Sequence, residues 1–153
     1  MDEPIFTPKT GQLDYMNVRR VPVINCVVKH DGRILLVKRS AKMQNYPSYW
    51  NGVSGFLNDG GSILQKAHDE LRRELGIAQS RIALMTEGEV FEYKDEDSDR
   101  VWVVHPVLVE ITAGEITLDW KAQEYQWVTI PEARTFHLLP GFERILDVFF
   151  RKP

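Results

Sequence analysis

The segment from Ser54 to Ile77 constrains the fold most, because its residue pattern changes once from that of a strand to that of a helix. A short apolar run ends at Leu57 and is followed by a turn rich in Asn, Asp and Gly. Ser62 and the glutamine three residues later form the pattern of a capping box, which predicts a helix start. One helix face is apolar and consists of Leu64, Ala67, Leu71 and Leu75. Gly76 predicts the helix end.

Two carboxylates, Glu70 and Glu74, are expected on one flank of this helix. Residues four apart lie close together at about 100° per residue, and this flank borders the apolar face. Carboxylates that share a small volume repel each other unless a hard cation separates them, and Mg²⁺ and Mn²⁺ prefer oxygen ligands. The same spacing is typical of a solvated surface, where a Glu70–Arg73 pair contributes only roughly tenths of a kcal/mol. Spacing alone favours the solvated surface.

The segment from Gly55 to Ile77 resembles the Nudix box, the signature of the Nudix hydrolase family, which reads G-x5-E-x7-R-E-U-x-E-E-x-G-U with U an aliphatic residue. An alignment without gaps matches the box at Gly55, Glu70, Leu71, Glu74, Gly76 and Ile77. Three residues depart from it: Gly61 replaces the first glutamate, Asp69 the arginine, and Arg73 the first glutamate of the E-E pair. The box is therefore degenerate.

The resemblance extends beyond the box. VPVINCVVKHDGRILLVKRS is similar to the family's first hairpin, YPSYWNGVSGFL to the segment that leads into the box, and LDWKAQEYQWVTIPEA to a late strand and short helix. The resemblance covers roughly residues 20–150 and implies an α/β fold, an α/β/α sandwich with a mixed sheet. We therefore expect a single Nudix-like domain at residues 21–153, preceded by an N-terminal arm at residues 1–20.

Residue patterns predict the other elements of the chain. Asp31-Gly32 is typical of a two-residue hairpin turn. Proline within a strand pattern predicts an edge or a bulge, so we expect Pro106 to break its strand. Pro131 is expected to open a short helix. The predicted strands are Val21–Val28, Ile34–Val37, Ile82–Glu92, Val101–Ile111, Glu115–Leu118 and Glu124–Val128, and an amphipathic helix containing Phe142 to Phe149 ends the chain.

The resemblance implies an enzyme that hydrolyses a diphosphate linkage in a nucleoside diphosphate derivative with Mg²⁺ or Mn²⁺. Carried over by position, Glu70 and Glu74 would bind the metal and act in catalysis, and Gly55 would allow the bend from strand to loop. The metal would offset phosphate charge and lower the pKa of the attacking water. Glu124, Glu92 or the acidic loop at residues 94–100 could replace a missing ligand.

The candidate substrate-binding residues are Arg39, Tyr46, Gly55 and Glu124. Arg39 follows a predicted strand and is either an ordinary solvated residue or, in the Nudix-like interpretation, close to the phosphates. Tyr46 lies in a loop whose aromatic residues could stack on a base. Trp50 occupies a family position before the box and is expected to pack in the core.

Arg73 leaves three functional hypotheses. In the favoured one, the protein is a hydrolase with fewer metal ions, and Arg73 acts at the catalytic site by contacting a phosphate in place of one cation. In the second, it is a nucleotide-binding module of Nudix fold without activity. In the third, it is a protein-interaction domain that binds through the N-terminal arm or the C-terminal helix.

The composition narrows the choice of partners. The net charge of −3 comes from 19 basic and 22 acidic residues that are well mixed, which argues against nonspecific binding to nucleic acid or to a membrane surface. The one cysteine, Cys26, lies in an apolar run and indicates a reducing compartment. We expect a cytoplasmic protein that acts on a small phosphorylated nucleotide, and the apolar residues of the arm are compatible with a homodimer.

Overall fold

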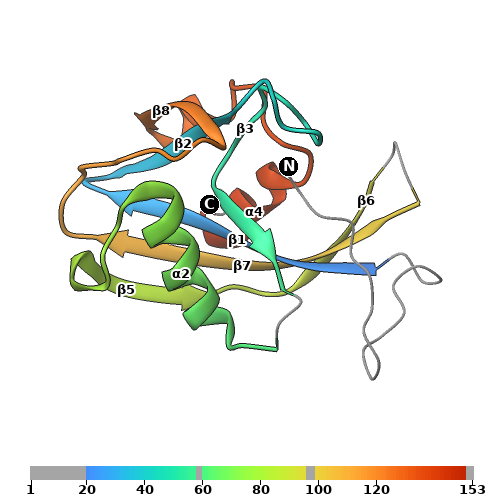
Figure 1. The fold of residues 1–153 in the computed structure, drawn as a ribbon, viewed down its shortest axis with the longest axis horizontal. Coiled ribbons are helices and arrows are strands. Elements are labelled where there is room, and N and C mark those ends of the chain that lie inside the picture. Colours follow the sequence, from blue (N-terminus) through green and yellow to red (C-terminus); the bar gives the residue numbers. More distant parts are fainter. Residues whose placement is uncertain (1–19, 58–59, 96–98, 151–153) are drawn as a thin grey trace.

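A computed structural model describes residues 20–57, 60–95 and 99–150, and in it a mixed sheet of eight strands lies between two layers of helices (Figure 1). Helix α2, Ile63–Leu75, covers one face, and helix α4, Phe142–Phe149, covers the other. Alternate residues of one central strand explain the two layers, because Cys26 packs with α2 and Val27 packs with α4. The predicted α/β/α sandwich is confirmed.

Strand β1, Arg20–His30, is the centre of the sheet. It pairs in antiparallel orientation with β2, Arg33–Arg39, and with β4, Val53–Phe56, and in parallel orientation with β7, Val101–Ile111. The turn between β1 and β2 is Asp31-Gly32, with positive φ angles of 53° and 76°, as the sequence predicts. The other strands are β3 (Trp50–Asn51), β5 (Ile82–Glu87), β6 (Phe91–Lys94) and β8 (Ala122–Val128).

The predicted helices form with the expected signals at their ends. The Ser62 hydroxyl accepts a hydrogen bond from the Gln65 amide at 3.1 Å, whereas the Gln65 side chain donates to Asp69 rather than completing a capping box. Gly76 ends α2 in the left-handed conformation. The short helices are η1 (Gln79–Arg81) and α3 (Ile130–Ala133), and α3 has Pro131 in its first turn.

Three strand predictions need correction. Residues 115–118 are not a strand, because the Thr117 amide donates to the carbonyl of Leu75 and so covers the end of α2 instead of joining the sheet. Residues 82–92 are not one strand, because β5 ends at Glu87 and β6 begins at Phe91; at Gly88, between them, a Cβ would collide with α4. Strand β7 continues through Pro106 and is interior there. On one side it pairs with β1, and on the other side its neighbour changes at this point from β6 to β5.

Two further points concern the ends of the chain and membranes. The predicted arm lies outside the described residues, except that Arg20 begins β1. Within the described ranges, no helix has both the length and the apolar character needed to cross a bilayer.

Candidate active site

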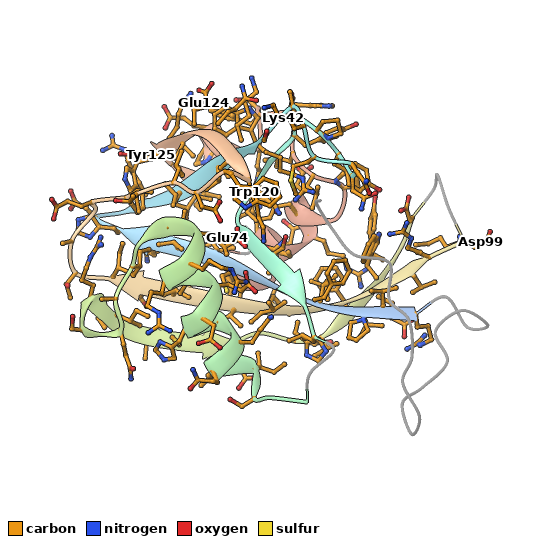
Figure 2. All side chains as sticks on the ribbon, viewed as in Figure 1. Lys42, Glu74, Asp99, Trp120, Glu124 and Tyr125 are labelled. Atoms are coloured by element: carbon orange, nitrogen blue, oxygen red, sulfur yellow. The ribbon has the colours of Figure 1, made fainter. Side chains whose placement is uncertain are left out.

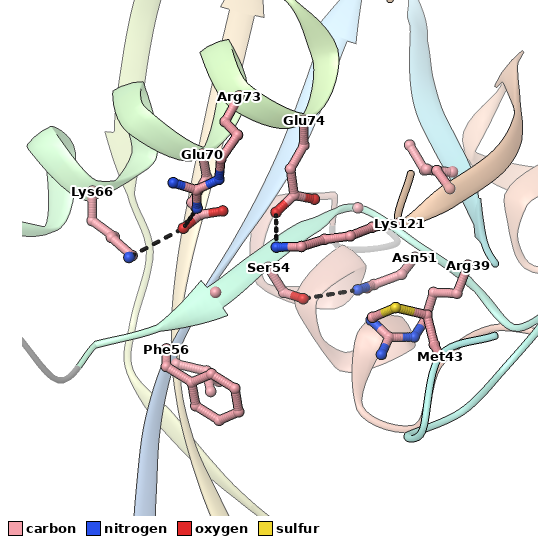
Figure 3. A pocket seen from close by; sticks show the side chains of 15 residues that line it. Arg39, Met43, Asn51, Ser54, Phe56, Lys66, Glu70, Arg73, Glu74 and Lys121 are labelled. Carbon is pink, nitrogen blue, oxygen red and sulfur yellow. Dashed lines mark hydrogen bonds and ion pairs between the residues drawn. The ribbon is translucent and has the colours of Figure 1, made fainter. Parts of the chain in front are cut away.

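One flank of helix α2 carries the charged residues Lys66, Glu70, Arg73 and Glu74 toward strand β4 (Figure 3). Their spacing of three and four residues places them along the same side of the helix. Core residues of α2, among them Leu71, lie immediately beside this flank. The helix therefore holds these charges at the boundary between the core and a cavity.

Glu70 is a buried carboxylate, with only 2% of its side chain exposed. Its Oε2 atom accepts hydrogen bonds from Lys66 Nζ at 3.1 Å and from Arg73 Nη2 at 2.5 Å. Burial alone would raise the pKa of Glu70, but hydrogen bonds from Glu74, Arg73 and Lys66 outweigh it and lower the pKa. The solvated-surface interpretation of this helix flank is therefore wrong for Glu70.

Gly55 in β4 makes room for the Glu70 carboxylate. A Cβ atom at this position would lie 2.7 Å from Glu70 Oε2 and 2.8 Å from Glu70 Cδ. Any side chain here would therefore displace the carboxylate. Gly55 acts through close approach to Glu70, which is a more specific role than the strand-to-loop bend expected from the sequence.

Glu74 lies next to Glu70 and is 14% exposed. Burial and the neighbouring Glu70 carboxylate raise the pKa of Glu74 well above its ordinary value, and Lys121, at 3.5 Å from Glu74 Oε2, offsets part of this effect. A protonated Glu74 is hydrogen-bonded to Glu70, whereas with both groups ionised Glu70 Oε1 is buried without a partner. The pair thus has one carboxylate that stays ionised and one poised to gain or lose a proton.

These residues line a cavity of about 250 Å³ between α2, the start of β8 and the β2–β3 segment. Six charged side chains line it, the cations Arg39, Lys66, Arg73 and Lys121 and the carboxylates Glu70 and Glu74. Asn51 and Ser54 add polar groups, and Asn51 Nδ2 donates to Ser54 Oγ at 3.3 Å. The cavity carries more positive than negative charge, which suits an anionic ligand.

A second, more apolar cavity adjoins the first. It shares Val23, Arg39 and Ser54 with the charged cavity, and its aromatic lining consists of Tyr46, Tyr93, Trp102 and Phe142. The Tyr46 hydroxyl donates to Asp95 at 3.0 Å, which fixes the ring. This cavity of about 60 Å³ places aromatic side chains directly beside the charged cavity.

The structure separates the residues singled out in the sequence into three groups. Glu70, Glu74, Arg73, Arg39 and Gly55 line the charged cavity, and Tyr46 lines the apolar one. Glu124 is exposed on β8 and lines neither; Figure 2 shows it well apart from Glu74. Glu92 is exposed and pairs with Arg20, and the acidic loop lies partly outside the described residues. Trp50 is buried, as predicted.

Sequence reasoning missed Lys66, Lys121, Asn51 and Ser54. Lys66 had a usable signal, because it precedes Glu70 by four residues on the same helix face. Lys121 had none, because it lies 47 residues from its partner Glu74. It reaches the cavity only because the segment before β8 packs against the end of α2, where the Asp119 amide donates to the Glu74 carbonyl.

The carboxylate pair fits one divalent cation. Mg²⁺ is commonly held by one or two carboxylates together with water and substrate phosphates. Glu70 offers the unpartnered Oε1 atom, and Glu74 lies beside it. Within residues 20–57, 60–95 and 99–150, no cluster of three or more Asp, Glu, His or Cys side chains is arranged to hold a metal ion. Among the described side chains, the carboxylate ligands in this cavity are therefore the Glu70–Glu74 pair.

The charge pattern and the fold together define the class of protein. A cavity with four basic side chains around two carboxylates suits phosphate oxygens, and here it lies beside the central helix of an α/β/α sandwich. The family model described as the NUDIX domain matches residues 18–150. The chain therefore belongs to the NUDIX family of hydrolases, whose members act in general as pyrophosphohydrolases on nucleotide derivatives.

Known proteins are similar to the chain over most of its length. The CTP pyrophosphohydrolase of Escherichia coli (strain K12) is 29% identical over 136 residues, which cover 86% of this chain and 93% of that protein. The MutT NUDIX hydrolase of Burkholderia pseudomallei has a TM-score of 0.73 at 21% identity, covering 85% of this chain and 98% of that one. The family and the hydrolase class predicted from the sequence are thus confirmed.

A second similar structure contains a nucleotide and a metal. It is the bifunctional NMN adenylyltransferase/ADP ribose pyrophosphatase of Francisella tularensis complexed with AMP and Mn ion. Its TM-score is 0.68 at 20% identity, covering 84% of this chain and 40% of that one. Divalent metal and nucleotide therefore occur together in a protein of this fold.

Proposed function

We propose that the protein hydrolyses a diphosphate linkage in a nucleoside diphosphate derivative, with Mg²⁺ or Mn²⁺ held by Glu70 and Glu74. The observation that carries this proposal is the buried Glu70, whose Oε1 atom is unpartnered beside a second carboxylate in a cation-lined cavity. Nucleoside triphosphates are the first substrates to test, and CTP in particular, because the relative described above is named for that substrate.

The two adjoining cavities suggest how such a substrate binds. Its phosphates would lie among the cations of the charged cavity, and its base would lie against Tyr46, Tyr93 and Trp102 in the apolar one. Arg39 lines both cavities, so it is placed near the junction of sugar and phosphate. Its guanidinium donates to the Asn45 carbonyl at 2.7 Å, which fixes it there.

Glu70 and Glu74 have different roles in the proposed reaction. Glu70 stays ionised because Lys66 and Arg73 stabilise its charge, so it serves as the permanent anionic ligand. The raised pKa of Glu74 suits a general base that takes the proton of the attacking water as the phosphorus–oxygen bond of the leaving group breaks. A bound divalent cation would supply charge neutralisation and acidify that water. Arg73 and Lys121 would orient the phosphates.

The test is release of nucleoside monophosphate from a panel of nucleoside triphosphates and other nucleoside diphosphate derivatives, with Mg²⁺ and with Mn²⁺. Wild type is compared with Glu74→Gln, which keeps the side-chain shape and removes the base. Metal-dependent turnover that falls at least about 10²-fold in the variant supports the proposal. If no compound of the panel is hydrolysed but nucleotide still binds, the result favours a nucleotide-binding module without activity.

Three predictions from the sequence, on the partner, the compartment and the oligomeric state, are part of this proposal. The partner is a small phosphorylated nucleotide, and the compartment is the cytoplasm, in keeping with the buried and unbridged Cys26. A homodimer formed through the N-terminal arm is tested by light scattering of the full chain against a chain that begins at residue 18. A mass that halves on truncation supports the dimer.

A further inference from the structure

Three basic side chains form a cluster around the carboxylate pair, and we name Lys66, Arg73 and Lys121 the three-cation cluster. Lys66 and Arg73 both contact Glu70 Oε2, and Lys121 contacts Glu74 Oε2 (Figure 3). All three line the charged cavity. The cluster thus brings three protein cations to one carboxylate pair.

Neutralising the carboxylates needs fewer cations than the cavity holds. Two carboxylates carry at most two negative charges, whereas the three-cation cluster and Arg39 carry four positive charges. A cavity with surplus positive charge attracts anions.

The contacts of the cluster also leave room for a ligand. Arg73 is 53% exposed, so its guanidinium has donors that Glu70 does not use. Lys121 is 3.5 Å from Glu74, at the limit of a hydrogen bond, so moving it to a phosphate oxygen costs little. An ammonium group carries three donors, and the described contact uses one.

We propose that the three-cation cluster binds the diphosphate group of the substrate directly, so that substrate binding in this protein does not require a divalent metal. The cluster takes over the part of the metal's role that holds phosphate oxygens, because the described carboxylate ligands in this cavity are the Glu70–Glu74 pair. The choice of a diphosphate as ligand rests on the proposed function. Metal at the Glu70–Glu74 pair then matters for turnover and not for binding.

The test is isothermal titration calorimetry of the full chain with inorganic pyrophosphate, in EDTA and in Mg²⁺. We expect binding in EDTA that is within tenfold of the binding in Mg²⁺ and that weakens as salt is added. Absence of binding in EDTA, with binding restored by Mg²⁺, would overturn the inference. This comparison uses only the wild-type chain, so it does not depend on the folding of any variant.

Charge-removing variants identify the groups responsible. Arg73→Gln and Lys121→Met should each weaken pyrophosphate binding in EDTA about tenfold, the effect of losing one hydrogen bond to a charged group. Arg72→Gln is the matched control, because Arg72 is the exposed neighbour on α2 that does not line the cavity. If Arg72→Gln weakens pyrophosphate binding as much as Arg73→Gln does, the effect comes from net charge alone, and the assignment of Arg73 as a pyrophosphate ligand is overturned.

The inference and the proposed function fail in different ways. Pyrophosphate binding in EDTA without turnover of any nucleotide would support the cluster and contradict the hydrolase. Turnover by an enzyme whose ligand binding requires Mg²⁺ would support the hydrolase and contradict the cluster.

Discussion

Replacing Gly55 by alanine tests whether the position of Glu70 determines activity. The added Cβ would lie 2.7 Å from Glu70 Oε2, and ordinary contact begins at 3.4 Å, so the carboxylate must move by the difference, 0.7 Å. It cannot swing into solvent, because it is buried and held by Lys66 and Arg73. The substitution therefore shifts a constrained catalytic group without changing any charge.

The size of the effect follows from this displacement. Overpacking a filled site costs about 1–3 kcal/mol of stability, which lowers Tm by about 2–4 °C per kcal/mol in a chain of this size. Misplacing a reacting group by about 1 Å can cost about 10²-fold in rate. For a shift of 0.7 Å we expect kcat/KM to fall by about 10–100-fold while the protein stays folded at 25 °C.

The assay is steady-state nucleotide hydrolysis together with thermal unfolding, with Gly32→Ala as control. Gly32 lies in the β1–β2 turn with φ of +76° and with open space around it, so alanine there costs about 1–2 kcal/mol through the backbone alone. The control should lose similar stability and keep its activity. If Gly55→Ala retains half of wild-type kcat/KM, or loses no more than Gly32→Ala, the reasoning about Glu70 is refuted.

Three further predictions concern stability and substrate binding. The pKa of Glu74 is raised above its ordinary value of 4.5, so between these two values the folded state binds more protons than the unfolded state and stability falls as pH rises. The variant Glu74→Gln lacks this ionisation. Its stability relative to wild type should therefore be higher by about 0.5–2 kcal/mol at pH 8, and by less at pH 5, as measured by urea unfolding. Tyr46→Asn, which tolerates the φ of 51°, should raise KM about tenfold with kcat nearly unchanged, whereas Tyr46→Phe should retain KM. Phe142→Ala empties a fully buried site and should cost about 3–5 kcal/mol, seen as a Tm lower by about 6–20 °C; an unchanged Tm would contradict the assigned core.

Much of the fold could be predicted because its signals act over a few residues. The cap at Ser62, the left-handed Gly76 and the Asp31-Gly32 turn each depend on contacts within five residues. The nearly continuous run of apolar residues along β1 similarly indicates a sheet that is covered on both faces. Such local patterns were enough to predict β1, β2, α2 and α4.

Long-range pairing decided where local patterns gave the wrong answer. Pro106 suggested an edge, yet its missing N–H falls where the neighbour of β7 changes, so an interior strand tolerates it. Residues 115–118 had a strand pattern, but carbonyl groups at the end of α2 needed donors, and the Thr117 amide supplies one. Neither outcome follows from residues close in sequence.

The candidate site divides in the same way. The sequence by itself determined the shared flank of Glu70 and Glu74, because helix geometry fixes which residues face together. Only the tertiary structure decided that Glu70 is buried, since that required β4 to bring Gly55 against it. The same is true of Lys121, which reaches Glu74 across 47 residues. Burial and charge pairing, which set pKa values and ligand affinity, depend on all surrounding elements and so are tertiary properties.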